Sequence, residues 1–151
     1  MTKSEAREIL FTLVYESVFS PEKSAADIYE NARNERGFEN YRYIKKGLEY
    51  IVAERTRLEQ MIGSLSDGWN ADRIAPVTKA ILCVALYDIK VKSLAPSIAI
   101  NEAVELAKKY DADTAPAFVN GILNSAVTAD FPSGAEAATD SEEDAPDTAD
   151  E

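Results

Sequence analysis

The segments INEAVELAKKY (residues 100–110) and FVNGIL (residues 118–123) decide the fold class of this 151-residue chain. In the first segment apolar side chains recur every three or four residues, the spacing of one face of an α-helix, at Ile100, Ala103, Val104 and Ala107. The second repeats the pattern at Phe118, Val119, Ile122 and Leu123. Thr114 is a favourable N-cap residue, so the two segments predict amphipathic helices over residues 97–110 and 114–128.

Four further stretches show helical periodicity, at residues 3–19, 23–33, 38–62 and 76–91. Pro21 is expected to stop the first stretch, and Gly63 is expected to terminate the third. The fourth is apolar nearly all round, which is typical of a central helix surrounded by others. The sequence therefore predicts an all-α fold, a compact bundle of about six or seven helices.

The helical pattern ends near Ala129, and the residues that follow have a different composition. Residues 130–151 carry nine of the 27 acidic residues and none of the 16 basic ones, which leaves residues 1–129 nearly neutral. Such a segment cannot bury enough apolar surface to offset the entropy lost on ordering. We therefore predict a helical domain over residues 1–129 and a disordered acidic tail over residues 130–151.

Several kinds of chemistry find no support in the sequence. The chain has no His and a single Cys, which removes the commonest general base and any zinc site built from thiolates and imidazoles. It has no GxGxxG or GxxxxGK[ST] motif to cradle a phosphate. We therefore expect no enzyme activity, no catalytic residue, no metal site and no cofactor.

The sequence also predicts where the protein resides. Its apolar runs are too short to span a bilayer, and the N-terminal MTKSEAREIL lacks the apolar region of a secretory signal. Cys83 has no second cysteine with which to form an internal disulfide. These features predict a cytoplasmic protein without a membrane partner.

Basic residues gather in three places where they could contact the phosphates of a nucleic acid. Lys3 and Arg7, four residues apart, share a face of the first predicted helix. The other two clusters are Arg42, Lys45 and Lys46, and Lys108 and Lys109. The alternative for each cluster is a solvated face, and for the last also a set of cations that complements the dipole of a helix C-terminus.

The two opening segments, with other residues upstream, resemble the NusB family of transcription antitermination proteins. The matching residues are Pro96, 100–110 and 118–123, and upstream Arg7, Glu8, Tyr15, Trp69, Arg73, Ile81, Leu82 and 85–88. The resemblance covers residues 3–128 and implies an all-α fold of two helical bundles with a non-catalytic role. It implies binding of single-stranded boxA-type RNA in nascent ribosomal RNA transcripts, together with the ribosomal protein NusE. The resulting complex joins RNA polymerase and suppresses premature termination.

The resemblance also suggests individual contact residues. Lys3, Arg7 and Phe118 are the expected RNA contacts, and Tyr15 and Phe19 are expected to face NusE. Phe118 lies one turn after a helix N-terminus, where an aromatic ring could stack on an unpaired base. Core packing is the alternative for all three aromatic residues.

Three polar or small residues inside the last two helices are expected to serve the architecture. Asn101 and Asn120 are predicted to hydrogen-bond across the helix pair, because polar groups in apolar helices need partners. Gly121 is predicted to mark a close approach of two helices, since glycine within a helix costs about 1 kcal/mol relative to alanine.

A second functional reading remains open at this point. The N-terminal stretch Lys3-Ser4-Glu5-Ala6 is less basic than is usual in the family, and each missing phosphate contact lowers RNA affinity. The chain could therefore be a divergent NusB-like module that binds proteins and has weak or no affinity for RNA.

Overall fold

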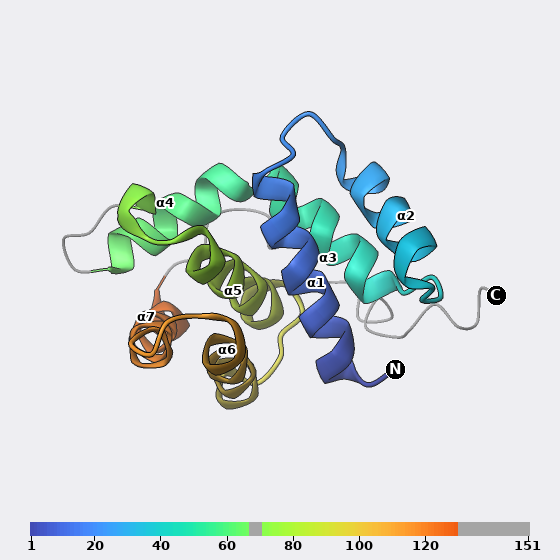
Figure 1. Ribbon diagram of the computed structural model, residues 1–151. Helices are drawn as coiled ribbons and strands as arrows, with labels where there is room; N and C mark the ends of the chain where they lie inside the picture. Colours follow the sequence, from blue (N-terminus) through green and yellow to red (C-terminus); the bar gives the residue numbers. More distant parts are fainter. Residues whose placement is uncertain (67–70, 130–151) are drawn as a thin grey trace.

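The computed structural model describes residues 1–66 and 71–129, and within these residues it contains helices and no strand (Figure 1). The elements are α1 (Lys3–Val18), α2 (Ala25–Arg36), α3 (Arg42–Ala53), α4 (Arg55–Leu65), a 3₁₀ turn (Ala71–Arg73), α5 (Pro76–Leu86), the π-helical turn η2 (Tyr87–Val91), α6 (Pro96–Tyr110) and α7 (Ala115–Thr128). The predicted all-α fold is confirmed for the described residues. Trp69, one of the residues that carry the family resemblance, and the predicted tail at residues 130–151 lie outside them.

The helices form two groups that share one hydrophobic core. Helices α1, α2 and α3 pack on one another, and α4, α5, α6 and α7 form the second group. Helix α1 joins the groups, because it packs against α3 on one side and α5 on the other (Figure 1). The buried cluster runs without a break from Leu10 in α1 to Leu123 in α7.

Helix α5 is the central helix that its apolar sequence predicted. Every residue from Ala80 to Leu86 is buried, and α1, α4, α6 and α7 all contact the helix. Fully burying a Leu or Ile side chain stabilises a fold by about 1.5–3 kcal/mol, so a helix buried on all sides contributes strongly. Within the described residues, no helix is both long and apolar enough to cross a membrane.

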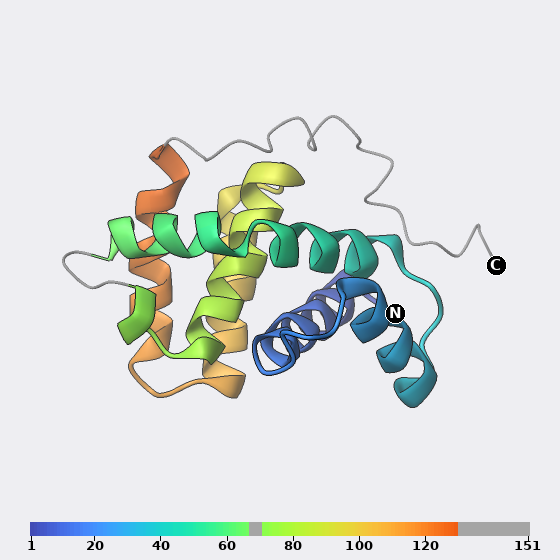
Figure 2. The same cartoon turned by 90° about the horizontal axis from the view of Figure 1, so that it is seen from above.

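The unbroken helix predicted over residues 38–62 is wrong, because the chain forms α3 and α4 with a break at Glu54. The backbone of Glu54 departs from helical geometry at φ −103° and ψ 14°, although its N–H still donates to the Tyr50 carbonyl at 2.9 Å. The two helices therefore run nearly in line (Figure 2). The break lets α3 pack on α1 and α2 while α4 packs on α5 and α7. Gly63 lies inside α4 and does not terminate it.

The stretch predicted as one helix over residues 76–91 changes its hydrogen bonding after Leu86. In η2 the Lys92 N–H donates to the Tyr87 carbonyl, five residues back, at 3.0 Å. A π-helical turn accommodates one extra residue and is common at functional sites. Here it carries Asp88, whose side chain is buried between α1 and α3.

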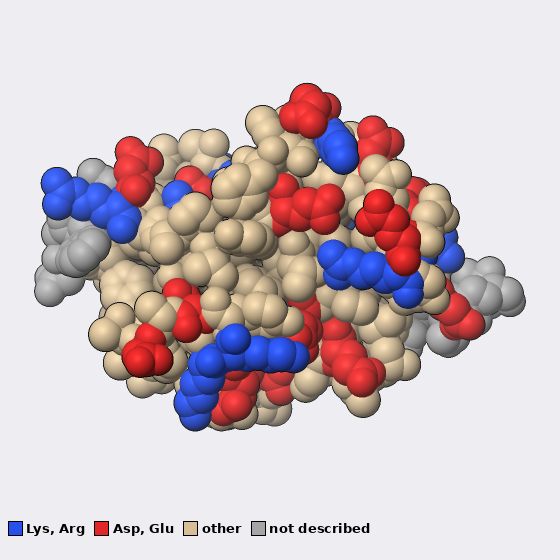
Figure 3. Space-filling model, viewed as in Figure 1, with Lys and Arg blue, Asp and Glu red and all other residues tan. Residues whose placement is uncertain are grey.

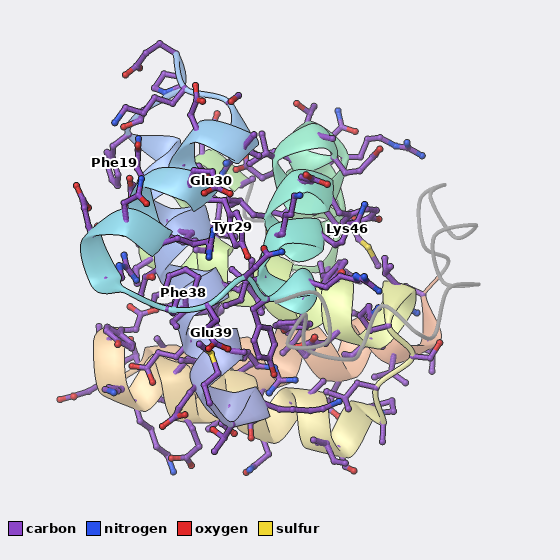
Figure 4. The ribbon with its side chains drawn as sticks, turned by 90° about the vertical axis from the view of Figure 1, so that its right-hand side faces the viewer. Phe19, Tyr29, Glu30, Phe38, Glu39 and Lys46 are labelled. Carbon is purple, nitrogen blue, oxygen red and sulfur yellow. The ribbon has the colours of Figure 1, made fainter. Side chains whose placement is uncertain are left out.

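The connection between α2 and α3 is anchored by Tyr29, which lies between the two helices (Figure 4). Gly37 caps α2 in the left-handed region at φ 74°, a conformation that glycine adopts without strain. The Tyr29 hydroxyl donates to Asn40 Oδ1 at 2.5 Å and accepts from the Tyr41 N–H at 2.7 Å. These bonds fix the backbone of Tyr41 at the start of α3.

Candidate nucleic-acid and partner interface

Helix α1 has two cations, and the one in its first turn, Lys3, is exposed to solvent. Thr2 and Glu5 form a capping box, in which the Thr2 hydroxyl accepts from the Glu5 N–H at 3.0 Å and Glu5 accepts from the Thr2 N–H at 2.7 Å. Lys3 is exposed and has no ion pair with any described residue. Arg7, four residues further on, is only 7% exposed.

Arg7 belongs to a buried polar cluster that also contains Asp88, Tyr43 and Glu102. Its Nε donates to Asp88 Oδ2 at 2.7 Å, and its terminal nitrogen lies 3.3 Å from Glu102 Oε1. The Tyr43 hydroxyl donates to the other oxygen of Asp88 at 2.8 Å. The guanidinium also lies over the Tyr43 ring, 5.7 Å from its centroid. The cluster therefore ties α1, α3, η2 and α6 together.

Burial and charge act against each other in this cluster. Burial raises the pKa of Asp88 above its ordinary value, and the Arg7 charge with the hydrogen bonds from Arg7 and Tyr43 opposes that rise. Burial alone would lower the pKa of Arg7, but Tyr43, Asp88 and Glu102 together raise it. Arg7 is thus held as a cation that neutralises a buried carboxylate.

The structure therefore gives Arg7 a role in holding helices together, and the predicted RNA contact of this residue stays a prediction. In this conformation the guanidinium is buried and bound to two carboxylates. The spacing of Lys3 and Arg7 could not reveal this, because Asp88 and Glu102 lie far away in sequence. Asp88 was the available signal, since a carboxylate within an otherwise apolar helix needs a buried partner.

The residues expected to face NusE form an exposed aromatic run on α1. Phe19 is 61% exposed and Tyr15 is 38% exposed, whereas Phe11 beneath them is buried. The rings of Tyr15 and Phe19 meet edge to face at 5.1 Å, and Phe11 lies 6.4 Å from Tyr15 and 5.0 Å from Tyr110. In Figure 4 Phe19 lies at the edge of the molecule, far from Lys46 on α3.

The predicted RNA contact Phe118 is half-buried in the first turns of α7 and packs against the core. Thr114 occupies the N-cap position, but its side chain makes no capping hydrogen bond. The Ala115 and Phe118 N–H groups donate to the Ala112 and Thr114 carbonyls, and Pro116 has no N–H, so this helix end offers few donors to a ligand.

The architectural roles predicted for three residues of α6 and α7 are wrong. Asn101 and Asn120 are exposed, and Asn120 accepts a hydrogen bond from Asn124 on its own helix instead of bonding to α6. A Cβ added to Gly121 would meet nothing within 4 Å, so no close helix approach requires this glycine. Asn101 and Asn120 instead line an open groove between α6 and α7.

Several cations of the predicted clusters are paired with carboxylates. Lys109 lies 2.6 Å from Glu8 and Lys108 lies 3.4 Å from Glu105. Lys46 lies 4.0 Å from Glu49. Figure 3 accordingly shows Lys and Arg beside Asp and Glu on the α1 face, instead of one continuous basic field.

The described side chains at this surface are of kinds that suit binding. No group of three or more potential metal ligands occurs in residues 1–66 and 71–129. The fold brings together two sets of side chains. The buried Arg7 cluster holds helices in place, and cations and aromatic rings lie at the surface.

The sequence model of the NusB family matches residues 4–128. The chain belongs to the NusB family. Its similar relatives include the transcription antitermination protein NusB of Agathobacter rectalis, 38% identical over 127 residues, which cover 82% of this chain and 97% of the relative. The same protein of Natranaerobius thermophilus is 34% identical over 129 residues, covering 82% and 93% of the two chains.

The structural comparison supports the NusB fold independently of close sequence similarity. The solved structure of T. maritima NusB superposes with a TM-score of 0.75 and covers 90% of this chain and 97% of that one, at 20% identity. The resemblance found in the sequence is thus confirmed at the level of family and fold. NusB proteins are transcription antitermination factors and not enzymes, which agrees with the expectation of a non-catalytic protein.

Proposed function

We propose that this NusB-family chain acts in transcription antitermination by binding boxA-type single-stranded RNA together with the ribosomal protein NusE. In this account the pair joins the RNA polymerase antitermination complex on nascent ribosomal RNA transcripts, in the cytoplasm. The observation that carries the proposal is the family match over residues 4–128, combined with the exposed aromatic run on α1.

The aromatic run has the properties of a protein-binding surface. Exposed aromatic side chains are enriched at the centres of interfaces, where they bury a large apolar area with little loss of conformational entropy. Tyr15 and Phe19 are positioned before binding, because their rings touch each other and the Tyr15 ring stacks on the buried Phe11. We therefore assign Tyr15 and Phe19 to the NusE contact.

The RNA contacts are assigned to groups that a strand can reach. Lys3 is exposed and offers an ammonium group to a phosphate. Phe118 is half-buried, so one part of its ring is held by the core while another part can stack on a base. Arg7 supports this surface from beneath by fixing α1 to η2.

The partner assignment is tested with Phe19→Ser and a matched control, Ile98→Ser, which removes an exposed apolar side chain of similar exposure from α6. NusE affinity is measured by calorimetry. Phe19→Ser is expected to weaken binding roughly 10- to 100-fold, as central aromatic contacts do, while Ile98→Ser binds like the wild type. Equal affinities of both variants and the wild type would show that NusE binds elsewhere.

The alternative function is that of a divergent NusB-like protein-interaction module with weak or no RNA binding. The burial of Arg7 favours it, since Lys3 is the other cation of α1 and stands alone at its start. This alternative predicts NusE binding with no accompanying gain in RNA affinity.

A further inference from the structure

An open groove of about 560 Å³ runs between α6 and α7, which pack side by side at the lower edge of the molecule in Figure 1. Half-buried apolar side chains and exposed amide groups line it together. The main apolar residues are Ile100, Val104 and Pro116, and the amides are Asn101, Asn120 and Asn124. The groove is therefore apolar and also able to form hydrogen bonds, a combination that is common in protein interfaces.

The groove carries no charge of its own, since none of the described residues that line it is Lys, Arg, Asp or Glu. Helix α7 has no charged residue between Ala115 and Thr128, although charged residues make up 28% of the chain. A nucleic-acid phosphate or a highly charged peptide would find no opposite charge here. An uncharged surface fits this groove better, because neither side then buries an ionised group.

A second copy of this chain offers such a surface in its own groove. Each copy has a net charge of −11, so two copies repel one another, and contact through the uncharged face brings no like charges together. The amides are also self-complementary, because an Asn side chain both donates and accepts and can pair with the same residue across a twofold axis.

The amides keep hydrogen-bonding capacity for such a partner. Asn124 Nδ2 donates to the Asn120 carbonyl at 2.9 Å and to Asn120 Oδ1 at 3.2 Å. The Asn120 amide nitrogen and the Asn124 amide oxygen have no partner among the described residues. One donor and one acceptor are thus left for the amides of a second copy.

Gly121, next to Asn120 on the exposed side of α7, is a residue that the isolated fold does not require. A Cβ added there would meet nothing within 4 Å, yet glycine inside a helix costs about 1 kcal/mol relative to alanine. A backbone without a Cβ lets another chain approach closely. Contact with a second copy would therefore explain this glycine.

We propose that the groove between α6 and α7 is a self-association surface, through which two copies of this chain pair about a twofold axis with their Asn120 and Asn124 amides facing one another. The contact is separate from the proposed NusE surface on α1, and Phe118 is not among the residues that line the groove. It therefore does not depend on the proposed function.

The test is sedimentation velocity of the full chain over a range of concentrations, without RNA or NusE. The wild type is expected to change from monomer to dimer as its concentration rises. Asn120→Lys places like charges opposite each other at the axis and is expected to weaken the dimer more than tenfold. Asn31→Lys, at an exposed position of α2 in the other helical group, makes the same change in net charge and is expected to associate like the wild type.

A steric variant separates association from folding. Gly121→Leu is expected to weaken the dimer at least tenfold without lowering the temperature of thermal unfolding, because the position is open within one copy. Added salt is expected to strengthen the wild-type dimer, since it screens the repulsion between two acidic chains and the groove has no ion pair to lose.

Amide NMR locates the surface. The side-chain signals of Asn101, Asn120 and Asn124 are expected to shift as the wild-type concentration rises. A wild type that remains monomeric throughout, or a dimer that Asn120→Lys and Gly121→Leu leave intact, would overturn the proposal. Shifts of these signals only when NusE is added to a monomeric chain would also overturn it and assign the groove to NusE.

Discussion

Replacing Arg7 with methionine tests whether this residue holds the fold together or contacts RNA. The variant keeps most of the side-chain volume but leaves Asp88, whose side chain is 2% exposed, as an unpaired buried carboxylate with only the Tyr43 hydroxyl as donor. Breaking a buried ion pair by removing one partner costs about 3–5 kcal/mol. The Glu102 contact adds little, because that side chain is 25% exposed and its attraction is screened by water.

A loss of that size is a large fraction of the total stability of a single domain, which is about 5–15 kcal/mol. It corresponds to a fall of roughly 10 °C in Tm for a chain of this length. The assay is urea unfolding followed by far-UV circular dichroism, with Lys3→Met as a control that is expected to stay within about 0.5 kcal/mol of the wild type.

A double variant identifies the physical cause. Arg7→Met/Asp88→Leu removes both charges, so its destabilisation is expected to be smaller than the sum of the two single effects. A loss below about 1 kcal/mol for Arg7→Met, accompanied by a more than tenfold loss of RNA affinity, would refute the reasoning and restore Arg7 as an RNA contact.

Three further changes have definite expected outcomes. Gly121→Ala is expected to raise the free energy of unfolding by about 0.5–1 kcal/mol, because the position is exposed, helical and open, and chemical denaturation measures it. Hydrogen bonds from Lys109 and Tyr110 lower the pKa of Glu8 from 4.5. The stability that Glu8→Gln loses at neutral pH should therefore shrink as pH falls below that value. Unfolding curves at several pH values would contradict this if the difference in stability between the variant and the wild type stayed constant. Burial raises the pKa of Cys83 to about 12, so a disulfide reagent at pH 8 should label this thiol only in denaturant.

The sequence pattern predicted which segments are helical because hydrophobic periodicity is a local signal. The apolar residues of α5 predicted a central helix, and Thr114 and Thr128 marked the ends of α7 closely. The break at Glu54 was not predictable in the same way, since neither glycine nor proline occupies it. It depends on which neighbours α3 and α4 pack against, and that is a property of the whole fold.

The site was less accessible to prediction because it depends on contacts between distant residues. Arg7 and Lys3 looked equivalent on a helical face, yet partners 81 and 95 residues away bury only Arg7. Phe19 and Tyr15 could equally have been core residues, and their exposure is decided by where α1 lies relative to its neighbours.

The central claim is that the chain binds RNA as part of a pair with NusE. The most direct measurement is the affinity of a fluorescent boxA RNA for the chain, for NusE and for the mixture of the two, at one physiological salt concentration. The account predicts that the mixture binds the RNA at least tenfold more tightly than either protein alone, and that Phe19→Ser abolishes this gain. An RNA affinity of the mixture no greater than that of the separate proteins would contradict it.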